Sequence, residues 1–393
     1  MEGAAVLTGE AWRTFCERLA ALGDRILEPD FPTDDRDRAE GFRHIANQLA
    51  CWLTFAVGHT DGKHPLLFRH NDLVYRWGGP NVDQNARRAV IAGDGTYRIS
   101  GNLGACDEFI VQVKTGEMHT GGSRICAETS ASRLGLGHGD DFEIVLSPKK
   151  HAGHWLELDP SADLVHIRDY YFDWQARMPA SFVIERLDTQ GVAKPALTAD
   201  AVAETLDVAL MQIENSIVYW NDYLRARRQE VGATNRFESA RFVPEGVHDI
   251  RYSDAFIDLD DDHALVVEVD PADADLWDIQ LYNPAWYESL DFGNRVTSLN
   301  HRLAFRNADG KIRVVIANRD PGVANWLDTE GRSSVVGPIR WWRVKDSPHL
   351  HNQVVVLDEL RAILPSDTPV VSASERREEL RRRAAHVAWR YHT

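Results

Sequence analysis

Apolar residues recur three or four positions apart in four stretches of the chain. Residues 9–27 and 34–57 show this spacing, which predicts two amphipathic helices in the N-terminal part of the chain. Residues 199–230 show it over the longest distance, and Asp200 is placed to cap the start of that helix. An arginine-rich helix is predicted over residues 374–391. Helices are thus expected in both terminal parts of this sequence and near its middle.

Between these helices, apolar and polar residues alternate with period two, which is typical of β-strands. Such runs lie at residues 89–101 and 303–316, further short strands are predicted at 109–114, 142–146, 155–158 and 164–171, and the continuous apolar run 354–357 is predicted as a buried strand. Residues 89–101 and 303–316 each carry Asp-Gly between two alternating halves, and both are predicted as β-hairpins. The two share the form Asp-Gly-x-apolar-Arg-apolar at residues 94–99 and 309–314. This similarity fits either two related β modules or a chance match between short hairpins.

The pattern predicts an α+β fold that is mostly β. We expect two β-sandwich or jelly-roll-like modules, because short strands at this spacing favour sandwiches and barrels. The predicted parts are an N-terminal helical entry, a first β module, a connecting helix, a second β module and a C-terminal helix. Their boundaries are residues 1–57, 58–195, 196–235, 236–371 and 372–393, respectively.

Four aromatic and turn motifs near the C-terminal end resemble those of a known family. They are Trp277 with Tyr282, Asn307-Ala308-Asp309-Gly310, Asn325-Trp326-Leu327 and Arg340-Trp341. This region, roughly the last third of the chain, is similar to the bacterial proteins called domain of unknown function 1214. The resemblance implies a two-part, mostly β architecture. It implies no particular activity and assigns no catalytic residues.

The composition and net charge of the chain limit the classes of partner that we expect. The chain has 393 residues, 44% hydrophobic and 26% charged, which is ordinary for a globular protein. Its net charge of −16 repels nucleic acid and anionic lipid, so neither partner is predicted. No apolar run reaches membrane-spanning length, and the first residues lack a basic region followed by an apolar core, so a cytoplasmic protein is expected. A small-molecule substrate and a homo-oligomer are both compatible with this composition.

Motifs for common cofactors are missing from the sequence. There is no GxGxxG after a strand, no phosphate-binding GxxxxGK[ST] and no GxSxG, so we predict no nucleotide cofactor and no α/β-hydrolase. Two histidine groups could hold a metal, namely His59, Asp61 and His64 in a loop, and His349 with His351 in an extended segment. Neither matches a recognised ligand spacing. Solvated histidines are the favoured interpretation, and no metal is predicted.

Candidate catalytic and substrate-binding residues occur where polar side chains follow turns. Gly78-Gly79-Pro80 forces a tight turn, after which Asn81 and Asp83 present amide and carboxylate groups. An ordinary Asx turn explains these residues nearly as well. Arg88, a few residues later, could bind a substrate carboxylate through two parallel hydrogen bonds from its guanidinium group.

Two aromatic regions supply further candidates. Asp169 and Tyr171 stand in a run of rings that either fills a core, the favoured interpretation, or forms a cavity wall with Asp169 as base. Residues 276–342 contain five Trp and two Tyr, and an apolar pocket there could be lined by Tyr282, Trp286, Tyr287, Asn300, His301 and Trp326, although packing between helix and sheet is again favoured. Arg340 in the same region could hold an anionic group of a substrate.

These residues give one hypothesis, a cofactor-independent hydrolase or lyase that acts on a small, fairly apolar organic substrate in a pocket between the β modules. Its catalytic candidates are Asp83, Asp169, Tyr171 and His301. Its substrate-binding candidates are Asn81, Arg88, Tyr282, Trp286, Trp326 and Arg340. The alternatives are a non-catalytic β-sandwich that binds carbohydrate or lipid, and an assembly subunit that docks through its arginine-rich terminal helix. The arginines and glutamates of that helix are, however, typical of a solvated helix.

Overall fold

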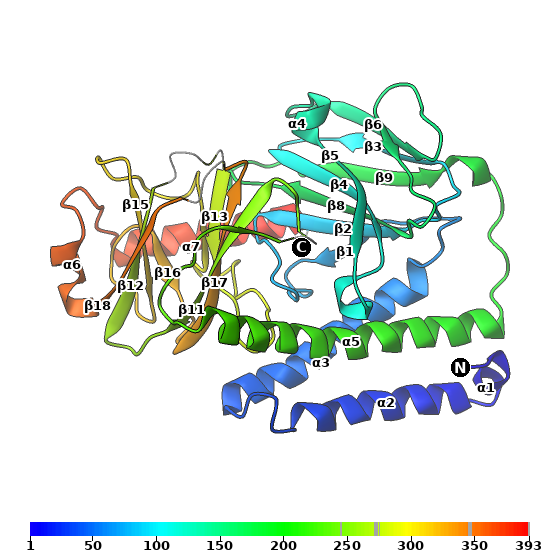
Figure 1. Cartoon of the computed structure of the whole chain (residues 1–393), viewed down its shortest axis with the longest axis horizontal. Helices are drawn as coiled ribbons and strands as arrows, with labels where there is room; N and C mark the ends of the chain where they lie inside the picture. The colour runs from blue at the N-terminus through cyan, green and yellow to red at the C-terminus, as the bar shows by residue number, and fades with distance from the viewer. Residues whose placement is uncertain (244–245, 271–273, 275, 345–347, 392–393) are drawn as a thin grey trace. The chain divides into compact units, whose positions relative to one another are not determined.

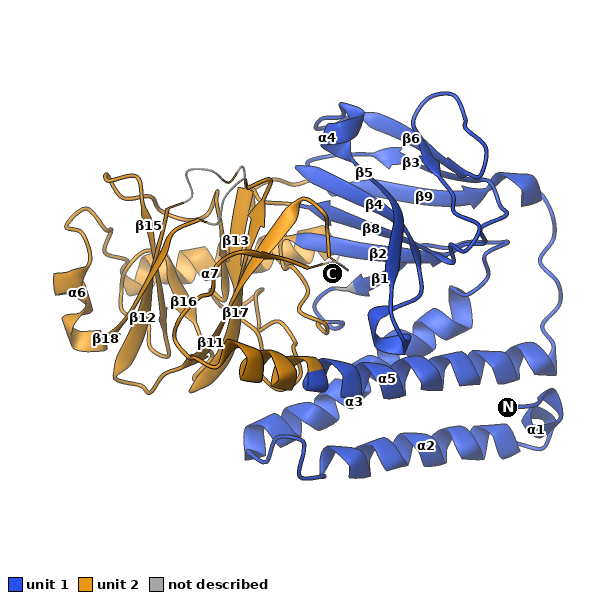
Figure 2. Ribbon diagram, in the orientation of Figure 1, with its two compact units in different colours: residues 1–75, 84–170, 178–222 blue, residues 76–83, 171–177, 223–393 orange. Residues whose placement is uncertain are grey.

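The computed structural model describes the whole chain except residues 244–245, 271–273, 275, 345–347 and 392–393 and the side chain of Asn71. In the described residues the fold is mixed, mostly β, with eighteen strands in four sheets and seven α-helices (Figure 1). The chain divides into two compact units (Figure 2). Unit 1 comprises residues 1–75, 84–170 and 178–222, and unit 2 comprises residues 76–83, 171–177 and 223–393.

The predicted helices form where the apolar spacing placed them. The N-terminal part contains α1 (Gly3–Leu7), α2 (Glu10–Ile26) and α3 (Asp35–Gly58), and α5 (Ala199–Val231) is the long helix. Asp34 caps α3, because its carboxylate accepts hydrogen bonds from the first free backbone N–H groups of the helix. The helical entry and the long helix are therefore confirmed.

Unit 1 contains a five-stranded and a four-stranded sheet. The five-stranded sheet has the order β1 (Phe68–Asn71), β2 (Gln84–Val90), β8 (Leu164–Tyr170), β4 (Glu108–Thr115), β5 (Arg124–Ser130). The four-stranded sheet has the order β7 (Trp155–Glu157), β6 (Asp141–Ser147), β3 (Tyr97–Asn102), β9 (Ser181–Arg186). The sheets pack face to face: Phe109 of β4 lies 5.0 Å from the ring of Phe142 and 5.7 Å from that of Phe182. The short helix α4 (Ala131–Leu134) follows β5.

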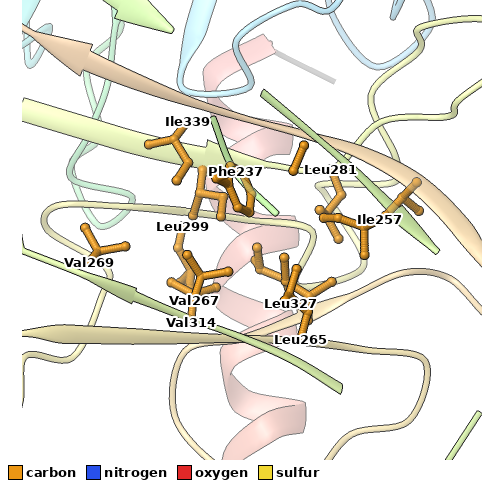
Figure 3. Packing of buried hydrophobic residues seen from close by; sticks show 14 of the residues in the cluster. Phe237, Ile257, Leu265, Val267, Val269, Leu281, Leu299, Val314, Leu327 and Ile339 are labelled. Carbon is orange, nitrogen blue, oxygen red and sulfur yellow. The ribbon is translucent and has the colours of Figure 1, made fainter. Parts of the chain in front are cut away.

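Unit 2 repeats this construction. Its five-stranded sheet has the order β10 (Arg241–Phe242), β11 (Ile250–Asp258), β17 (Ser334–Trp342), β13 (Leu276–Gln280), β14 (Ser298–Asn300). Its four-stranded sheet has the order β16 (Trp326–Asp328), β15 (Ile312–Ala317), β12 (His263–Val269), β18 (Leu350–Val356). Ile257 and Ile339 of the first sheet interdigitate with Leu265, Val267 and Val314 of the second to form the core (Figure 3). The helices α6 (Leu360–Ile363) and α7 (Ala373–Tyr391) complete the unit.

The two units have the same topology, strand for strand. If nine is added to each strand number of unit 1, both sheet orders of unit 2 result. In both units two neighbouring strands run parallel, β6 with β7 and β15 with β16. At that point the indole N–H of Trp155 donates to the carbonyl of Ser147 (3.2 Å), and that of Trp326 donates to the carbonyl of Ala317 (3.0 Å). The equivalent sequences are therefore Trp-Leu-Glu at 155–157 and Trp-Leu-Asp at 326–328, which favours a duplicated module.

The Asp-Gly motifs do not mark equivalent places. The motif at residue 94 precedes β3, and the motif at residue 309 precedes β15, whereas the topological equivalent of β3 is β12. The similarity between these two short runs is therefore not the trace of the shared topology.

Both hairpin predictions are wrong in their pairing. The strands β2 and β3 do form on either side of the first Asp-Gly, but each joins a different sheet. Leu303 and Phe305 lie in turns and coil, and β15 pairs with β12 and β16 instead. In a sandwich, consecutive strands often cross between sheets, because each sheet must bury its inner face against the other. Alternation predicts a strand but does not identify its partner.

The composition of α7 predicts a helix that is solvated on all sides, but the structure shows that one of its faces is buried. Arg376, Arg383 and Arg390 have only 7%, 4% and 1% of their surface exposed. They are spaced seven residues apart, which is about two helical turns, so they share one buried face. Arg377, Arg381 and Arg382 are exposed on the other side of the helix.

We expect Trp326→Phe to lower the free energy of unfolding by about 1–3 kcal/mol, because it leaves the buried Ala317 carbonyl without its donor and removes ring volume. Trp12→Phe, at a ring that is 56% exposed, is the matched control and should change stability by less than about 0.5 kcal/mol. Urea unfolding followed by circular dichroism measures both. Equal effects of the two substitutions would contradict the role assigned to the indole N–H.

Candidate active site

A buried polar network covers the outward face of the five-stranded sheet of unit 2. Ile339 and Trp341 of β17 point into the sandwich core, so Arg340 between them points outward. Asp278 of β13 is its direct neighbour across the ladder. Residues 76–83 lie over this face and bring Asp83 to it.

The centre of the network is an ion pair between Asp278 and Arg340. One guanidinium nitrogen of Arg340 donates to Asp278 Oδ1 at 3.0 Å, and Asn81 Nδ2 donates to Oδ2 at 2.9 Å. The other guanidinium nitrogen donates to the carbonyl of Gly79 at 2.8 Å and to Tyr282 Oη at 2.9 Å. Both charged groups are thereby supplied with partners, as buried charges require.

The same bonds fix the conformation of residues 79–83. Gln280 donates from Nε2 to Asn81 Oδ1 (2.7 Å) and accepts from the backbone N–H of Val82 (2.9 Å). Gly79 has φ +61°, and a Cβ there would lie 2.4 Å from the ring of Tyr287. Only glycine fits that position. The tight turn predicted from Gly-Gly-Pro is therefore one that brings the backbone against the sheet.

Asp83 is the end point of this segment, with only 1% of its surface exposed. Its Oδ1 accepts hydrogen bonds from Trp174 Nε1 (2.7 Å) and Asn300 Nδ2 (2.9 Å). Its Oδ2 has no hydrogen-bond partner among the residues that the structure describes. Burial, and next the negative charge of Asp278, raise the pKa of Asp83 to about 7. Burial also raises the pKa of Asp278, and Arg340 opposes that rise.

Two arginines of α7 lie beside Asp83. Arg390 donates to the carbonyl of Val82 at 2.6 Å, and its Nε and Nη1 find no hydrogen-bond partner in the described part of the chain. Its positive charge lowers the pKa of Asp83, against the larger effect of burial. Arg383 donates to Ser298 Oγ at 2.7 Å, and burial lowers its pKa to about 10. These cations stabilise a negative charge on Asp83.

A surface groove of about 490 Å³ adjoins the network through Trp174. The groove is lined by residues from the segment 171–177 of unit 2 and from α7. They are Trp174, Gln175, Ala176, Arg177, Arg381, Arg382, Ala385, His386 and Trp389. Trp174 and His386 stack with ring centroids 5.0 Å apart and an interplanar angle of 16°. Trp174 thus forms part of the groove and also donates to Asp83.

His386 is the buried polar residue of this groove. Burial, together with Arg390 and Arg383, lowers its pKa to about 2, so the ring is neutral. The backbone of Ala176 raises that pKa slightly, but no hydrogen bond of normal geometry reaches either ring nitrogen within the described residues. A ligand in the groove would therefore meet a neutral imidazole.

Several candidates from the sequence lie together in this network. They are Asp83, Asn81, Tyr282 and Arg340. Tyr171 adjoins them: its backbone N–H donates to the carbonyl of Asp83 at 2.7 Å, and Arg390 lies 5.9 Å over its ring. His301 packs edge-on against Phe172 at 4.9 Å, and Asn300 donates to the carbonyl of Phe172.

Other candidates lie elsewhere. Trp326 packs on the outward face of the four-stranded sheet, on the opposite side of the sandwich from Asp83. Trp286 is buried in the turn after β13, where Asn283 accepts from its backbone N–H. Asp169 belongs to unit 1, where it pairs with Arg87. Arg88 also belongs to unit 1 and pairs with Glu117.

Two members of the network, Asp278 and Arg390, are not among the candidates from the sequence. Asn300 and Trp174 stand in the two aromatic regions that the sequence singles out, but the sequence does not predict their bonds to Asp83. A signal existed for Asp278 and Arg390. Asp278 is an acid within an otherwise apolar strand, and Arg390 is the third in a series of arginines with seven-residue spacing.

No group of three or more metal-ligating side chains occurs among the described residues. His64 Nδ1 lies 3.0 Å from Asp61 Oδ2, which Lys194 approaches at 3.3 Å. His349 and His351 are exposed at the start of β18, next to residues 345–347, which lie outside the described residues.

Known proteins resemble this chain in sequence and in fold. The family model described as a protein of unknown function, DUF1214, matches residues 251–343. The crystal structure of an uncharacterized protein from Burkholderia cenocepacia is 30% identical, with a TM-score of 0.83, over 91% of this chain and 99% of that chain. The chain belongs to the DUF1214 family.

A second solved structure, the VPA0106 protein from Vibrio parahaemolyticus, is 11% identical with a TM-score of 0.44, over 80% of this chain and 98% of that one. No curated protein matches the chain. In the described part of this family member, none of the helices has the length and apolar character needed to traverse a bilayer.

The raised pKa of Asp83 predicts that stability falls with rising pH. Between the ordinary carboxyl pKa of 3.8 and about 7, the folded protein keeps a proton that the unfolded chain has lost, so stability decreases across this window and levels off above it. The loss amounts to about 4 kcal/mol in order of magnitude. Asp83→Asn should abolish this decrease and be more stable than the wild type at pH 8.

Chemical denaturation at pH 5 and pH 8 measures both quantities. Asp358→Asn, at an exposed carboxylate, is the matched control and should leave the pH dependence unchanged. If Asp83→Asn keeps the wild-type slope, Asp83 is ionised in the folded protein at pH 5 and the assignment fails.

Proposed function

We propose that unit 2 carries the active centre of a cofactor-independent enzyme, a hydrolase or lyase, in which Asp83 transfers a proton to or from a small, fairly apolar organic substrate. The observation that carries this proposal is a buried carboxyl whose pKa is raised to about 7 and whose second oxygen has no partner in the described chain. A general acid or base works best when its pKa lies near the working pH.

The environment of Asp83 supports this role. Trp174 and Asn300 hold Oδ1 and leave Oδ2 for a reacting group. Asp278 raises the pKa, and Arg390 limits that rise, so both protonation states are accessible near neutrality. Two interacting carboxylic acids in different surroundings are a common arrangement for acid–base chemistry.

The groove next to Trp174 is the proposed substrate site. Its rings supply apolar surface, as small-molecule sites commonly do. Arg177, Arg381 and Arg382 supply positive charge at the rim of the groove. A cytoplasmic location belongs to this proposal, because the structure describes all four cysteines and none forms a disulfide.

The second candidate function is binding without turnover. The stacked Trp174 and His386, with Trp389 beside them, favour a ligand with flat apolar faces, such as a carbohydrate ring, over a lipid chain. In this function the ligand would stabilise the protein, and Asp83→Asn would not change its affinity.

We expect Asp83→Asn to reduce kcat by about 10²–10⁴-fold, because the amide cannot transfer the proton. Wild type and variant would be incubated with a panel of small esters, lactones and β-hydroxy acids and followed by mass spectrometry. The wild-type pH profile of kcat/KM should show an apparent pKa near 7. Asp358→Asn serves as the control.

Full turnover by Asp83→Asn of a substrate that the wild type converts would refute the catalytic role. Stabilisation of both proteins by a ligand in a thermal-shift screen, with no conversion by either, would instead support the binding function.

A further inference from the structure

The outward face of the five-stranded sheet in unit 1 carries a second buried polar cluster. Phe109 of β4 points inward, so its neighbours Gln112 and Lys114, at alternating positions, share the opposite face. The cluster consists of Gln112, Lys114, Arg88, His166, Arg168 and His70. Helix α3 covers part of it: Arg88 lies 5.0 Å from the centre of the Trp52 ring and 6.0 Å from that of Phe55.

Because the two units share one topology, the outward face of this sheet in unit 1 can be compared with the outward face of the equivalent sheet in unit 2. The equivalent central strands β8 and β17 each carry an outward-facing arginine directly after an isoleucine, as Ile167-Arg168 and Ile339-Arg340. Opposite Arg340 stands Asp278, which neutralises it, whereas opposite Arg168 stands Ile110.

The residue pairs two positions before these arginines on the central strands also differ in charge between the two units. In unit 2, Asp254 of β11 stands opposite Pro338, and in unit 1 the corresponding pair is Arg88 opposite His166. With the two arginines aligned, two acidic positions of unit 2 are apolar or basic in unit 1.

Arg168 consequently lacks a carboxylate. Its Nη1 donates to the neutral Gln112 Oε1 at 2.6 Å, and no acidic side chain of the described residues forms an ion pair with it. The carboxylates near this face are engaged with other groups, Glu117 with Arg88 and Glu128 with Gln112 Nε2 (2.6 Å). A half-buried cation without an anionic partner favours an anion from outside the chain.

Two histidines lie beside this cation. The rings of His70 and His166 are 4.7 Å apart. His166 is only 8% exposed, and its Nε2 has no hydrogen-bond partner among the described side chains and backbone. Burial lowers the pKa of both, and Arg88, Arg168 and Lys114 lower it further, so both rings are neutral in a positive field. A neutral imidazole with a free Nε2 can donate to an oxyanion.

We propose that this face of unit 1 binds a small oxyanion, a carboxylate or phosphate group, between the guanidinium of Arg168 and Nε2 of His166. The planar guanidinium offers two parallel donors to such a group, and the anion supplies the charge that Asp278 supplies in unit 2. This site does not depend on the function proposed for Asp83, which lies in the other unit.

The full-length protein would be titrated with inorganic phosphate and with succinate by isothermal calorimetry at constant ionic strength, with sodium chloride as the reference. Tighter binding of one of the two identifies the group that the site prefers. Arg168→Gln should weaken binding by about tenfold or more. Arg98→Gln, at a surface arginine of unit 1 paired with Glu185, should bind as the wild type does.

Ile110→Asp is the reciprocal test, because it places in unit 1 the carboxylate that unit 2 has opposite its arginine. It should pair with Arg168 and weaken anion binding by about tenfold, with an unchanged circular dichroism spectrum. If Ile110→Asp does not fold, Arg168→Gln decides. Absence of binding by the wild type, or equal affinity in the wild type and Arg168→Gln, would overturn the proposal. Asp83→Asn should leave anion binding intact, so failure of either proposal can be told from failure of the other.

Discussion

The ion pair between Asp278 and Arg340 is the constraint on which the rest of unit 2 depends. A folded protein tolerates two buried charges only if their mutual attraction and their further hydrogen bonds offset the loss of hydration. Here the further partners are Asn81, the carbonyl of Gly79 and Tyr282. Residues 76–83 are consequently held against the sheet, and the carboxyl of Asp83 at their end is buried. The raised pKa of Asp83 follows from its burial and from this pair.

The two units use the same face of the same sheet in opposite ways. In both, the five-stranded sheet turns its inner side to the sandwich core and its outer side to polar chemistry, with an arginine on the central strand. Unit 2 supplies one acid, Asp278, to that arginine, whereas unit 1 surrounds its arginine with further cations and histidines. A duplicated module can keep its core, which needs only apolar residues of suitable volume, while the charges on its outer face change.

The sequence predicted part of the candidate site. Asn81, Asp83, Tyr282 and Arg340 were recognised because polar groups next to turns and aromatic residues stand out in an alternating pattern. Asp278 was not recognised, because its role depends on the strand that lies beside it. The sequence favours solvated arginines in α7, since their spacing shows that they share a face but not what that face contacts.

By itself, the sequence determined the α+β class, the positions of the helices and most strands, and the resemblance to the DUF1214 family. These follow from periodicity and local motifs, which each segment carries whatever its neighbours are. Only the tertiary structure decided which strands pair, that the two units share one topology, and that Trp326 and Asp83 lie on opposite sides of a sandwich. It also decided that Asp83 is buried with a pKa near 7. The physical reason is that pairing and charge state depend on groups far apart in the chain, whose proximity exists only after folding.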